Sequence, residues 1–490
     1  MKPRAHLPWV IAVIAALHAA GADFAGNAPC AECHAEIAAA YRRSAMARSS
    51  GEVDQLPAGE FWHPGSGTLY VMADGEMTFR KKVIEGRRRL PYFLGAGGLA
   101  RSYLIETDGY LFQAPVTYYA RAKQWDLSPG YEGYETVPLN RPVEPECLAC
   151  HAGRLQSVPA TQNRYRGRPF LEDGIGCERC HGPAGEHVRR KGRGAIVNPA
   201  KLDAKRRDSV CGECHLGGAV RIFRPGRRPG SFLPGEPLTD YAAVFRPSAG
   251  HMEQLWDSAC KKASGDRLWC GTCHDSHSGK AAGPEKCLTC HGPDDCGRGR
   301  DCLSCHMLKA AVRSIPHSAY TDHTIPRTPR PTAEPIWSLQ AIRPFWSDGA
   351  SDRETGLALA KIGIQRGKPE LFAHARELLQ PLEENLDGEA LLHLAVLCDR
   401  EGDEERAAVF YQRSLRLDPA LAEAAVNLGA ILAARGDIGG AMKLWRDALT
   451  RNPGLEAASI KLASAYWLRG EREAAWETLR RARLFLPELR

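Results

Sequence analysis

The pentapeptide Cys-x-x-Cys-His occurs seven times in this chain, and its residue types and spacing point to one kind of chemistry. Two thiols three positions apart can form thioether bonds with the two vinyl groups of one haem, and the adjacent imidazole then binds the iron as proximal ligand. Random placement of 17 Cys and 17 His in 490 residues would give roughly 0.02 such pentapeptides. The pattern therefore predicts seven covalently bound haem c (heme c) groups.

We number these motifs one to seven in chain order. The predicted attachment residues are Cys30, Cys33, Cys147, Cys150, Cys177, Cys180, Cys211, Cys214, Cys270, Cys273, Cys287, Cys290, Cys302 and Cys305. The predicted proximal ligands are His34, His151, His181, His215, His274, His291 and His306. Zinc also binds Cys-x-x-Cys pairs, but a structural zinc site needs two pairs and no His after each. The invariable His therefore favours haem.

Each six-coordinate haem needs a second, distal axial ligand. The candidates outside the motifs are His63, His187, His251, His277, His317 and His323, whereas His374 and His393 fall in the C-terminal repeats described below. Six candidates for seven haems leave two solutions: another donor at one haem, or one five-coordinate haem open to a substrate. Met46 is the best other donor because a thioether can bind haem iron, although Met more commonly fills a core.

Four segments resemble a family of multihaem cytochromes that includes tetrahaem electron carriers, octahaem enzymes such as hydroxylamine oxidoreductase, and relatives fused to tetratricopeptide repeats. These segments are Cys177–His187, His251–Cys260, Cys270–His277 and His317–His323. The resemblance covers most of residues 26–325. It implies that His187, His251, His277 and His323 are distal ligands, in many cases of a haem other than the one whose motif they follow.

Two details of the resemblance bear on function. Many relatives have Ser-x-His after the first motif, where this chain has Ser44-Ala45-Met46, and this difference makes Met46 a ligand candidate. Catalytic relatives often have Lys in place of one proximal His, or a crosslinking Tyr. All seven motifs here end in His, which favours an electron carrier over an enzyme.

Three cysteines lie outside the motifs. Cys260 and Cys296 could form a disulfide in an oxidising compartment, or remain two separate buried thiols. Cys398 is expected to fill the core of the C-terminal repeats.

The N-terminus has the layout of a secretory signal peptide. Lys2 and Arg4 precede the apolar run Leu7–Leu17, and the small residues Ala20-Gly21-Ala22 precede Asp23. The apolar run is shorter than the roughly 20 residues that span a bilayer, which disfavours a permanent anchor. We expect residues 1–22 to be removed and the mature chain to be periplasmic, without a transmembrane segment.

The formal net charge of +7 includes basic clusters such as Arg87-Arg88-Arg89, which could indicate nucleic-acid binding. Seven haems, however, would bring up to about fourteen propionate charges into the same part of the chain, so these arginines have nearer partners. No nucleic-acid partner is expected.

The elements that must position the motifs differ along the chain. The last three motifs are so close that only a helix or turn fits between them. Residues 60–125 contain alternating β-branched and aromatic runs with turn signals at Asp74-Gly75 and Asp108-Gly109, which predict a small antiparallel sheet. Tyr118, Tyr119 and Trp125 could line a pocket there or pack in its core. Residues 326–350 are rich in proline, as in an extended linker.

A 34-residue period follows the linker. It consists of Leu394, Leu428 and Leu462; Gly402, Gly436 and Gly470; Ala407, Ala441 and Ala475; and Pro419, Pro453 and Pro487. This is the tetratricopeptide repeat (TPR) signature, with three clear repeats and a degenerate one over about 352–385. Such repeats form an α-solenoid whose concave groove binds a partner, or they can serve as a packing platform for another domain.

The predicted fold is therefore mainly α. It has a signal peptide (1–22), a heptahaem cytochrome c domain (23–325) with a β-rich insertion, a linker (326–350) and a TPR domain (351–490) of three to four repeats. The predicted function is periplasmic electron transfer, with a redox partner bound by the repeats. The alternative is an oxidoreductase acting on a small nitrogen or sulfur compound at a five-coordinate haem, and a third possibility is a scaffold. Electron donor, acceptor and oligomeric state are left open.

Overall fold

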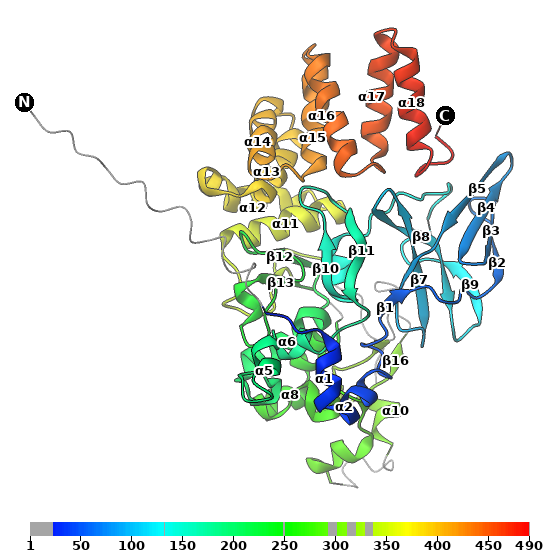
Figure 1. Cartoon of the computed structure of the whole chain (residues 1–490). Helices are drawn as coiled ribbons and strands as arrows, with labels where there is room; N and C mark the ends of the chain where they lie inside the picture. Colours follow the sequence, from blue (N-terminus) through cyan, green and yellow to red (C-terminus); the bar gives the residue numbers. More distant parts are fainter. Residues whose placement is uncertain are drawn as a thin grey trace, which may run out of the picture.

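The computed structural model describes residues 23–131, 133–247, 250–292, 301–310, 320–328 and 337–489 (Figure 1). The predicted signal peptide, Cys296, His317 and three prolines of the predicted linker lie outside these ranges. Among the described residues, no helix has both the length and the apolar character needed to cross a bilayer.

Between the first two motifs the chain forms two antiparallel sheets, with strand orders β1-β6-β7-β8-β9 and β2-β3-β4-β5. The strands are β1 (Ser50–Glu52), β2 (Gly59–His63), β3 (Thr68–Ala73), β4 (Glu76–Lys81), β5 (Ile84–Arg89), β6 (Tyr92–Leu94), β7 (Ala100–Thr107), β8 (Tyr110–Tyr119) and β9 (Gln124–Leu127). Alternate residues are buried, for example Tyr70 and Met72 in β3. Asp74-Gly75 and Asp108-Gly109 both have the positive φ angles of a tight hairpin turn, as predicted.

The haem motifs lie on short helices and turns below the solenoid in Figure 1. The helices are α1 (Asn27–Cys33), α2 (Ala35–Tyr41), α3 (Pro145–Ala149), α4 (Glu178–His181), α5 (Gly185–Arg189), α6 (Ala204–His215), α7 (His251–Asp257), α8 (Ala259–Ser264), α9 (Cys270–Cys273) and α10 (Cys302–His306), with 3-10 turns η1 (Pro199–Lys201), η2 (Leu238–Asp240), η3 (Gly265–Arg267) and η4 (Pro284–Thr289). Most of these helices are too short to be stable alone. Tertiary contacts and bound groups must hold them.

Small antiparallel pairs connect this region. They are β10 (Gly153–Ser157) with β11 (Tyr165–Glu172); β12 (Val220–Phe223), β13 (Ala242–Arg246) and β18 (Arg343–Pro344) in one sheet; β14 (His274–Asp275) with β15 (Lys280–Ala281); and β16 (Lys309–Ala310) with β17 (Tyr320–Thr321). Strand β18 lies within the predicted linker, so this part of residues 326–350 is packed against β13.

The C-terminal part is a solenoid of helix pairs, as predicted. The pairs are α11 (Asp352–Arg366) with α12 (Glu370–Leu379), followed by η5 (Gln380–Asn385); α13 (Gly388–Arg400) with α14 (Glu404–Leu417); α15 (Ala422–Ala434) with α16 (Ile438–Arg451); and α17 (Glu456–Leu468) with α18 (Arg472–Ala482). The repeated glycines end the first helix of each clear repeat with φ of 83°, 89° and 78°, a conformation that favours glycine. The repeated alanines are buried where paired helices meet.

Both ends of the solenoid are docked on the N-terminal part, and we call this arrangement the arch (Figure 1). At its first end, Arg353 of α11 donates a hydrogen bond to the carbonyl oxygen of Phe223 at 3.1 Å. At its last end, Phe485 enters the core of the β region, with its ring centre 4.9 Å from that of Phe112. The Leu139 N–H donates to the Phe485 carbonyl oxygen at 2.9 Å. The repeats therefore do serve as a packing platform.

The predicted fold class is confirmed: helices and antiparallel sheets in the N-terminal part are followed by a helical solenoid. The β region is larger than the expected 60–125, since its strands extend from Ser50 to Leu127. Cys398 is buried in the core of the repeats, as expected.

Candidate haem-binding sites

Cysteines from different motifs lie next to one another, which brings the motifs into a continuous series. Side-chain hydrogen bonds join Cys30 with Cys177, Cys150 with Cys214, Cys211 with Cys270, and Cys287 with Cys302. These pairs connect motifs one with three, two with four, four with five, and six with seven.

Two further contacts complete the series. Arg179, inside the third motif, forms an ion pair with Glu213 of the fourth motif at 2.6 Å and donates to the Ala149 carbonyl oxygen of the second at 2.9 Å. Cys287 of the sixth motif has a raised pKa. Burial is the largest cause and Cys302 the next, and Cys273 of the fifth motif also contributes, so Cys273 and Cys287 lie close together. All seven motifs are thus neighbours in one chain of contacts.

Burial sets the protonation of several of these thiols. It raises the pKa of Cys180 to about 11 and is the largest cause of the raised pKa of Cys177, about 12. Both thiols are therefore protonated at neutral pH. A thioether has no proton to lose, so attachment to a vinyl group suits positions where a thiolate is costly to bury.

Four motif and candidate histidines are oriented by backbone carbonyl groups. The Nδ1 atoms are paired with carbonyl oxygens as follows: His181 with Val197 at 2.8 Å, His187 with Gly194 at 2.9 Å, His306 with Pro326 at 2.7 Å, and His323 with Thr321 at 2.7 Å. A carbonyl oxygen only accepts, so each Nδ1 donates its proton. The Nε2 atom is then the nitrogen available to a metal, which is the usual arrangement of a metal-binding imidazole.

Two pairs of imidazole rings have the separation expected for opposite faces of one iron. The ring centres of His181 and His277 are 6.0 Å apart, and those of His274 and His323 are 6.2 Å apart. Two metal–nitrogen bonds of about 2 Å, with roughly 1 Å from each nitrogen to its ring centre, require about 6 Å. Burial lowers the pKa of His274 and His323, which favours the neutral, coordinating form.

His251 lies in the same cluster. Its ring centre is 4.6 Å from that of His323. Glu253, on the same helix, accepts a hydrogen bond from the Gly218 N–H at 2.8 Å, three residues after proximal His215. The structure therefore places His251 beside both the fourth and the fifth motif.

Met46 is in the turn after α2. Its carbonyl oxygen accepts a hydrogen bond from the Ile175 N–H at 2.9 Å, two residues before the third motif. The Ser49 hydroxyl donates to the His151 carbonyl oxygen at 2.7 Å. The turn with Met46 therefore connects the second and third motifs.

His63 occupies a different part of the molecule. It ends strand β2, where its side chain is buried and its ring stacks beside Phe61. The Ser66 N–H donates to its Nδ1 atom at 3.2 Å. Its hydrogen-bond and ring partners among the described residues belong to the β region, which Figure 1 shows on the far side from helices α5, α6 and α8. His317, the remaining candidate, lies outside the described residues.

Glu178 is a positioning residue that sequence reasoning missed. Its buried carboxylate accepts hydrogen bonds from the N–H groups of Ala25, Gly26 and Ala184, each at 2.8 Å. These bonds fasten the segment before α1, and hence the first motif, to the third. A Glu at a variable position of Cys-x-x-Cys gives no signal of this role in a single sequence.

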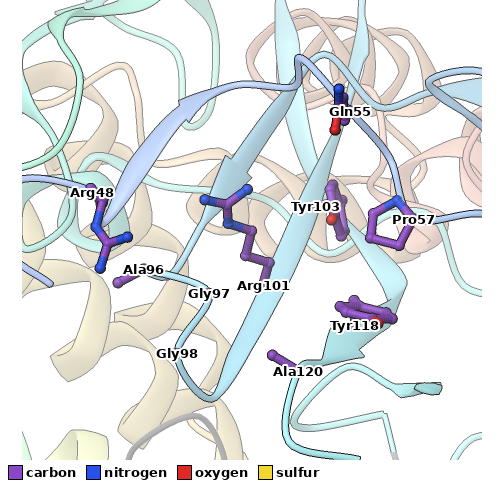
Figure 2. A pocket seen from close by; sticks show the side chains of 10 residues that line it. All are labelled: Arg48, Gln55, Pro57, Ala96, Gly97, Gly98, Arg101, Tyr103, Tyr118 and Ala120. Carbon is purple, nitrogen blue, oxygen red and sulfur yellow. The ribbon is translucent and has the colours of Figure 1, made fainter. Parts of the chain in front are cut away.

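A pocket of about 320 Å³ opens between the Met46 turn and the β region (Figure 2). Arg48, Arg101, Tyr103 and Tyr118 line it, together with the loop Ala96–Gly98. The Tyr103 hydroxyl is buried and has no hydrogen-bond partner within the described chain. Burial raises its pKa to about 12, so the hydroxyl stays protonated and can donate.

The aromatic residues predicted for this region divide between the two roles considered. Tyr118 lines the pocket, whereas Trp125 packs against Tyr118, with the two ring centres 5.5 Å apart. Tyr119 donates its hydroxyl to the Leu127 carbonyl oxygen. With two guanidinium groups and a phenol, the pocket suits a small anion.

The motif residues fit haem c. Each motif supplies two thiols and an imidazole at adjacent positions, and two of these imidazoles have a second imidazole with its ring centre 6.0 Å and 6.2 Å away, respectively. Within the ranges that the structure describes, no group of three or more Cys, His, Asp or Glu side chains is spaced to hold a metal ion by itself.

Comparisons with known proteins give a family match and structural similarities. The family model "Cytochrome c554 and c-prime" matches residues 121–182, which include the second and third motifs. A search of curated protein sequences finds no match. The outer cell wall cytochrome OcwA is similar over 90% of this chain and 99% of its own, with 15% identity and a TM-score of 0.39.

Two solved structures are similar to the repeats. MamA matches 26% of this chain and 75% of its own at 24% identity, and YrrB, a TPR protein with an unusual peptide-binding site, matches 28% and 70% at 20% identity. The TM-score is 0.24 for both. The cytochrome family match, together with seven Cys-x-x-Cys-His motifs, indicates a c-type cytochrome.

Proposed function

We propose that this chain is a periplasmic c-type cytochrome that carries electrons along seven covalently bound haems and binds a redox partner through its repeats. Haem c supplies a one-electron couple at each motif, with a potential that depends on its axial ligands and its burial. The observation that supports the proposal best is the continuous series of contacts among the seven motifs. Cofactors attached to neighbouring thiols would be close enough to form one path.

The protein supplies attachment, ligation and exclusion of water. The paired cysteines attach each haem, and the following imidazole is its proximal ligand. We assign His277 as the distal partner of His181, and His323 as that of His274, from their ring separations. His187, His251 and His317 are proposed as further distal ligands, and Met46 as the ligand of a remaining haem.

Mass spectrometry and a reductive titration of the mature protein test this proposal. We expect an N-terminus at Asp23, seven haems per chain, and uptake of seven electrons. Fewer haems than motifs would contradict it. Haems that accept electrons from dithionite but from no physiological donor would favour the scaffold role instead.

The partner is proposed to bind at the last repeat. The tip of α17 and α18 exposes Trp467, Leu468 and Trp476. The two indoles form an edge-to-face pair with ring centres 6.5 Å apart. Exposed aromatic side chains in a group are typical of protein interfaces.

Replacing Trp467 and Trp476 together by Ala tests this surface. We expect at least a tenfold slower reduction by a periplasmic electron-donor fraction and an unchanged rate with dithionite. Val409→Ala, at an exposed apolar position of α14, is the control and should leave both rates unchanged. Equal rates for the double variant and the parent would contradict the assignment.

The pocket in Figure 2 favours a second candidate, an oxidoreductase acting on a small anionic nitrogen or sulfur compound. Arg48 lies two residues after Met46, so an anion there would be near the turn that connects the second and third motifs. A high-spin EPR signal that changes when nitrite or sulfite is added would support this function. In the Arg101→Gln variant this signal should respond less to the anion. Seven low-spin haems would contradict it.

A further inference from the structure

His393 belongs to the solenoid, but its ring is oriented as a metal ligand would be. It lies on α13, and its Nδ1 atom is 2.9 Å from the carbonyl oxygen of Glu389, one turn earlier. The Nδ1 proton is therefore donated within the helix. Nε2 is left to bind another group, as in His181 and His323 above.

The repeat pattern does not require a histidine at this position. One period later the equivalent residue is Asn427, and two periods later it is Lys461. The neighbouring Leu394, by contrast, recurs as leucine in each clear repeat and is fully buried. Helix packing therefore explains Leu394 and leaves His393 unexplained.

The face of α13 with His393 is turned toward the second haem motif. Lys361 of α11 forms an ion pair with Glu389 at 2.5 Å. The same two groups act on Glu146, the residue before Cys147: burial is the largest influence and raises the pKa of Glu146, Lys361 lowers it, and Glu389 raises it further. These charged groups thus lie between α13 and helix α3.

The other side of this space also belongs to haem motifs. Arg221 of β12 lowers the pKa of Glu146, and it donates to the Gly212 carbonyl oxygen of the fourth motif at 3.3 Å. Residues of motifs two and four therefore lie near the charged groups on the face of α13 with His393.

Burial also affects side chains on both α3 and α13. It is the largest cause of the raised pKa of Glu146 and of Cys147. It is likewise the main cause of the lowered pKa of His393, which is half-buried.

We propose that His393 is the distal axial ligand of the haem attached to Cys147 and Cys150, opposite proximal His151. The assignment rests on the proposed function, because it needs a haem at the second motif. It also replaces His63 in the set of distal ligands. The Nδ1 atom of His63 pairs with the Ser66 hydroxyl at 2.8 Å, and the described hydrogen-bond and ring partners of His63 belong to the β region rather than to a haem motif.

This assignment gives the arch a part in the cofactor site. The solenoid holds one side of the second haem, and the cytochrome part holds the other. With His187, His251, His277, His317 and His323, His393 again makes six histidines, so Met46 or an open site still serves the seventh haem.

Replacing His393 by Gly tests the proposal. We expect the haem content to stay at seven, one haem to change from low spin to high spin in EPR and visible spectra, and that haem to bind CO when reduced. Added imidazole should restore the low-spin signal by filling the vacated space. In a second variant, His393→Met, one midpoint potential should rise, because thioether ligation raises the potential of a haem.

His63→Ala and the exposed His374→Ala are the matched controls and should leave the spectra unchanged. Unchanged spectra in both His393 variants, or a new high-spin haem in His63→Ala, would overturn this assignment and leave the proposed function intact. The assignment would also be wrong if the haem of the second motif is already high-spin in the parent, with His393 as a hydrogen-bonding neighbour. A second-motif peptide that carries no haem by mass spectrometry would contradict the proposed function as well.

Discussion

At the scale of single residues, the sites divide into those set by local spacing and those set by tertiary contacts. The predicted attachment cysteines and proximal histidines follow from one pentapeptide alone. The proposed distal partners do not, because His277 follows the fifth motif in sequence whereas its ring centre lies 6.0 Å from that of His181 of the third. Likewise, the sequence offers no means of distinguishing His63 in a sheet from His393 beside a motif.

Glu178 supports the first motif through backbone N–H groups, so its removal should destabilise the fold. Glu178→Ala leaves three donors without their charged acceptor and should lower the free energy of unfolding by about 3 kcal/mol. Glu178→Gln retains one carbonyl oxygen and should cost about half as much. Urea unfolding followed by circular dichroism measures both. Glu186→Gln, in an exposed ion pair on α5, is the control, and an equal loss there would contradict this role.

Met46→His tests whether Met46 is a ligand. Imidazole stabilises oxidised haem iron more than a thioether does, so one midpoint potential should fall while the haem content stays the same. Spectroelectrochemical titration resolves this change. If no potential moves, Met46 is a packing residue and one haem has an open or different distal position.

At the scale of elements, the docking of the solenoid was not predictable from its repeats. The 34-residue period specifies helices that pack on each other, and the structure shows four pairs. The contacts at its two ends depend on residues outside the period, such as Arg353 and Phe485. The β insertion was predictable from its alternating β-branched and aromatic runs and its hairpin turns. Its first strand, β1, is too short to show such an alternation.

Glu354 makes the first docking contact sensitive to acid. Burial by itself raises its pKa, but hydrogen bonds from Ser351 and Arg353 and the charge of Arg224 outweigh burial and hold the pKa below 4.5. The carboxylate therefore stabilises the fold fully above pH 4.5, and this contribution is lost as the pH falls through the lower folded pKa. Glu354→Gln should cost about 2 kcal/mol at pH 7 and much less at pH 3. Equal differences at both pH values in urea unfolding would contradict this.

Phe485 makes the second docking contact largely by apolar burial. Phe485→Ala should lower the free energy of unfolding by about 3 kcal/mol and increase hydrogen exchange in α18. Leu484→Ala changes an exposed neighbour and should have little effect. Similar effects of the two substitutions would show that the C-terminus is not held by this ring.

At the scale of the whole molecule, apolar cores and haem motifs occupy different regions. The large cores lie in the solenoid and in the β region, whereas the short motif helices pack around smaller clusters. The cytochrome part therefore depends on its cofactors for much of its interior. The sequence predicts seven haems but not this division, which depends on contacts between segments far apart in the chain.

Protein made without haem attachment should consequently be folded in part. We expect the solenoid and the β region to resist proteolysis, and the segment from about residue 177 to 310 to be cleaved rapidly, since helices of this length need external contacts. Limited proteolysis with mass spectrometry compares the two forms. Equal resistance of the motif segment with and without haem would contradict this dependence.

The arch also limits how this protein can change over time. A solenoid with a free end can gain or lose a repeat, because each added unit contacts only its neighbours. Here α11, the turn from Arg451 to Gly454 and Phe485 each contact the N-terminal part, so the spacing of these contacts determines the number of repeats. Duplication of one 34-residue unit would break one of these docking contacts. Variation among descendants of this chain should therefore appear as substitutions within the repeats rather than as changes in their number.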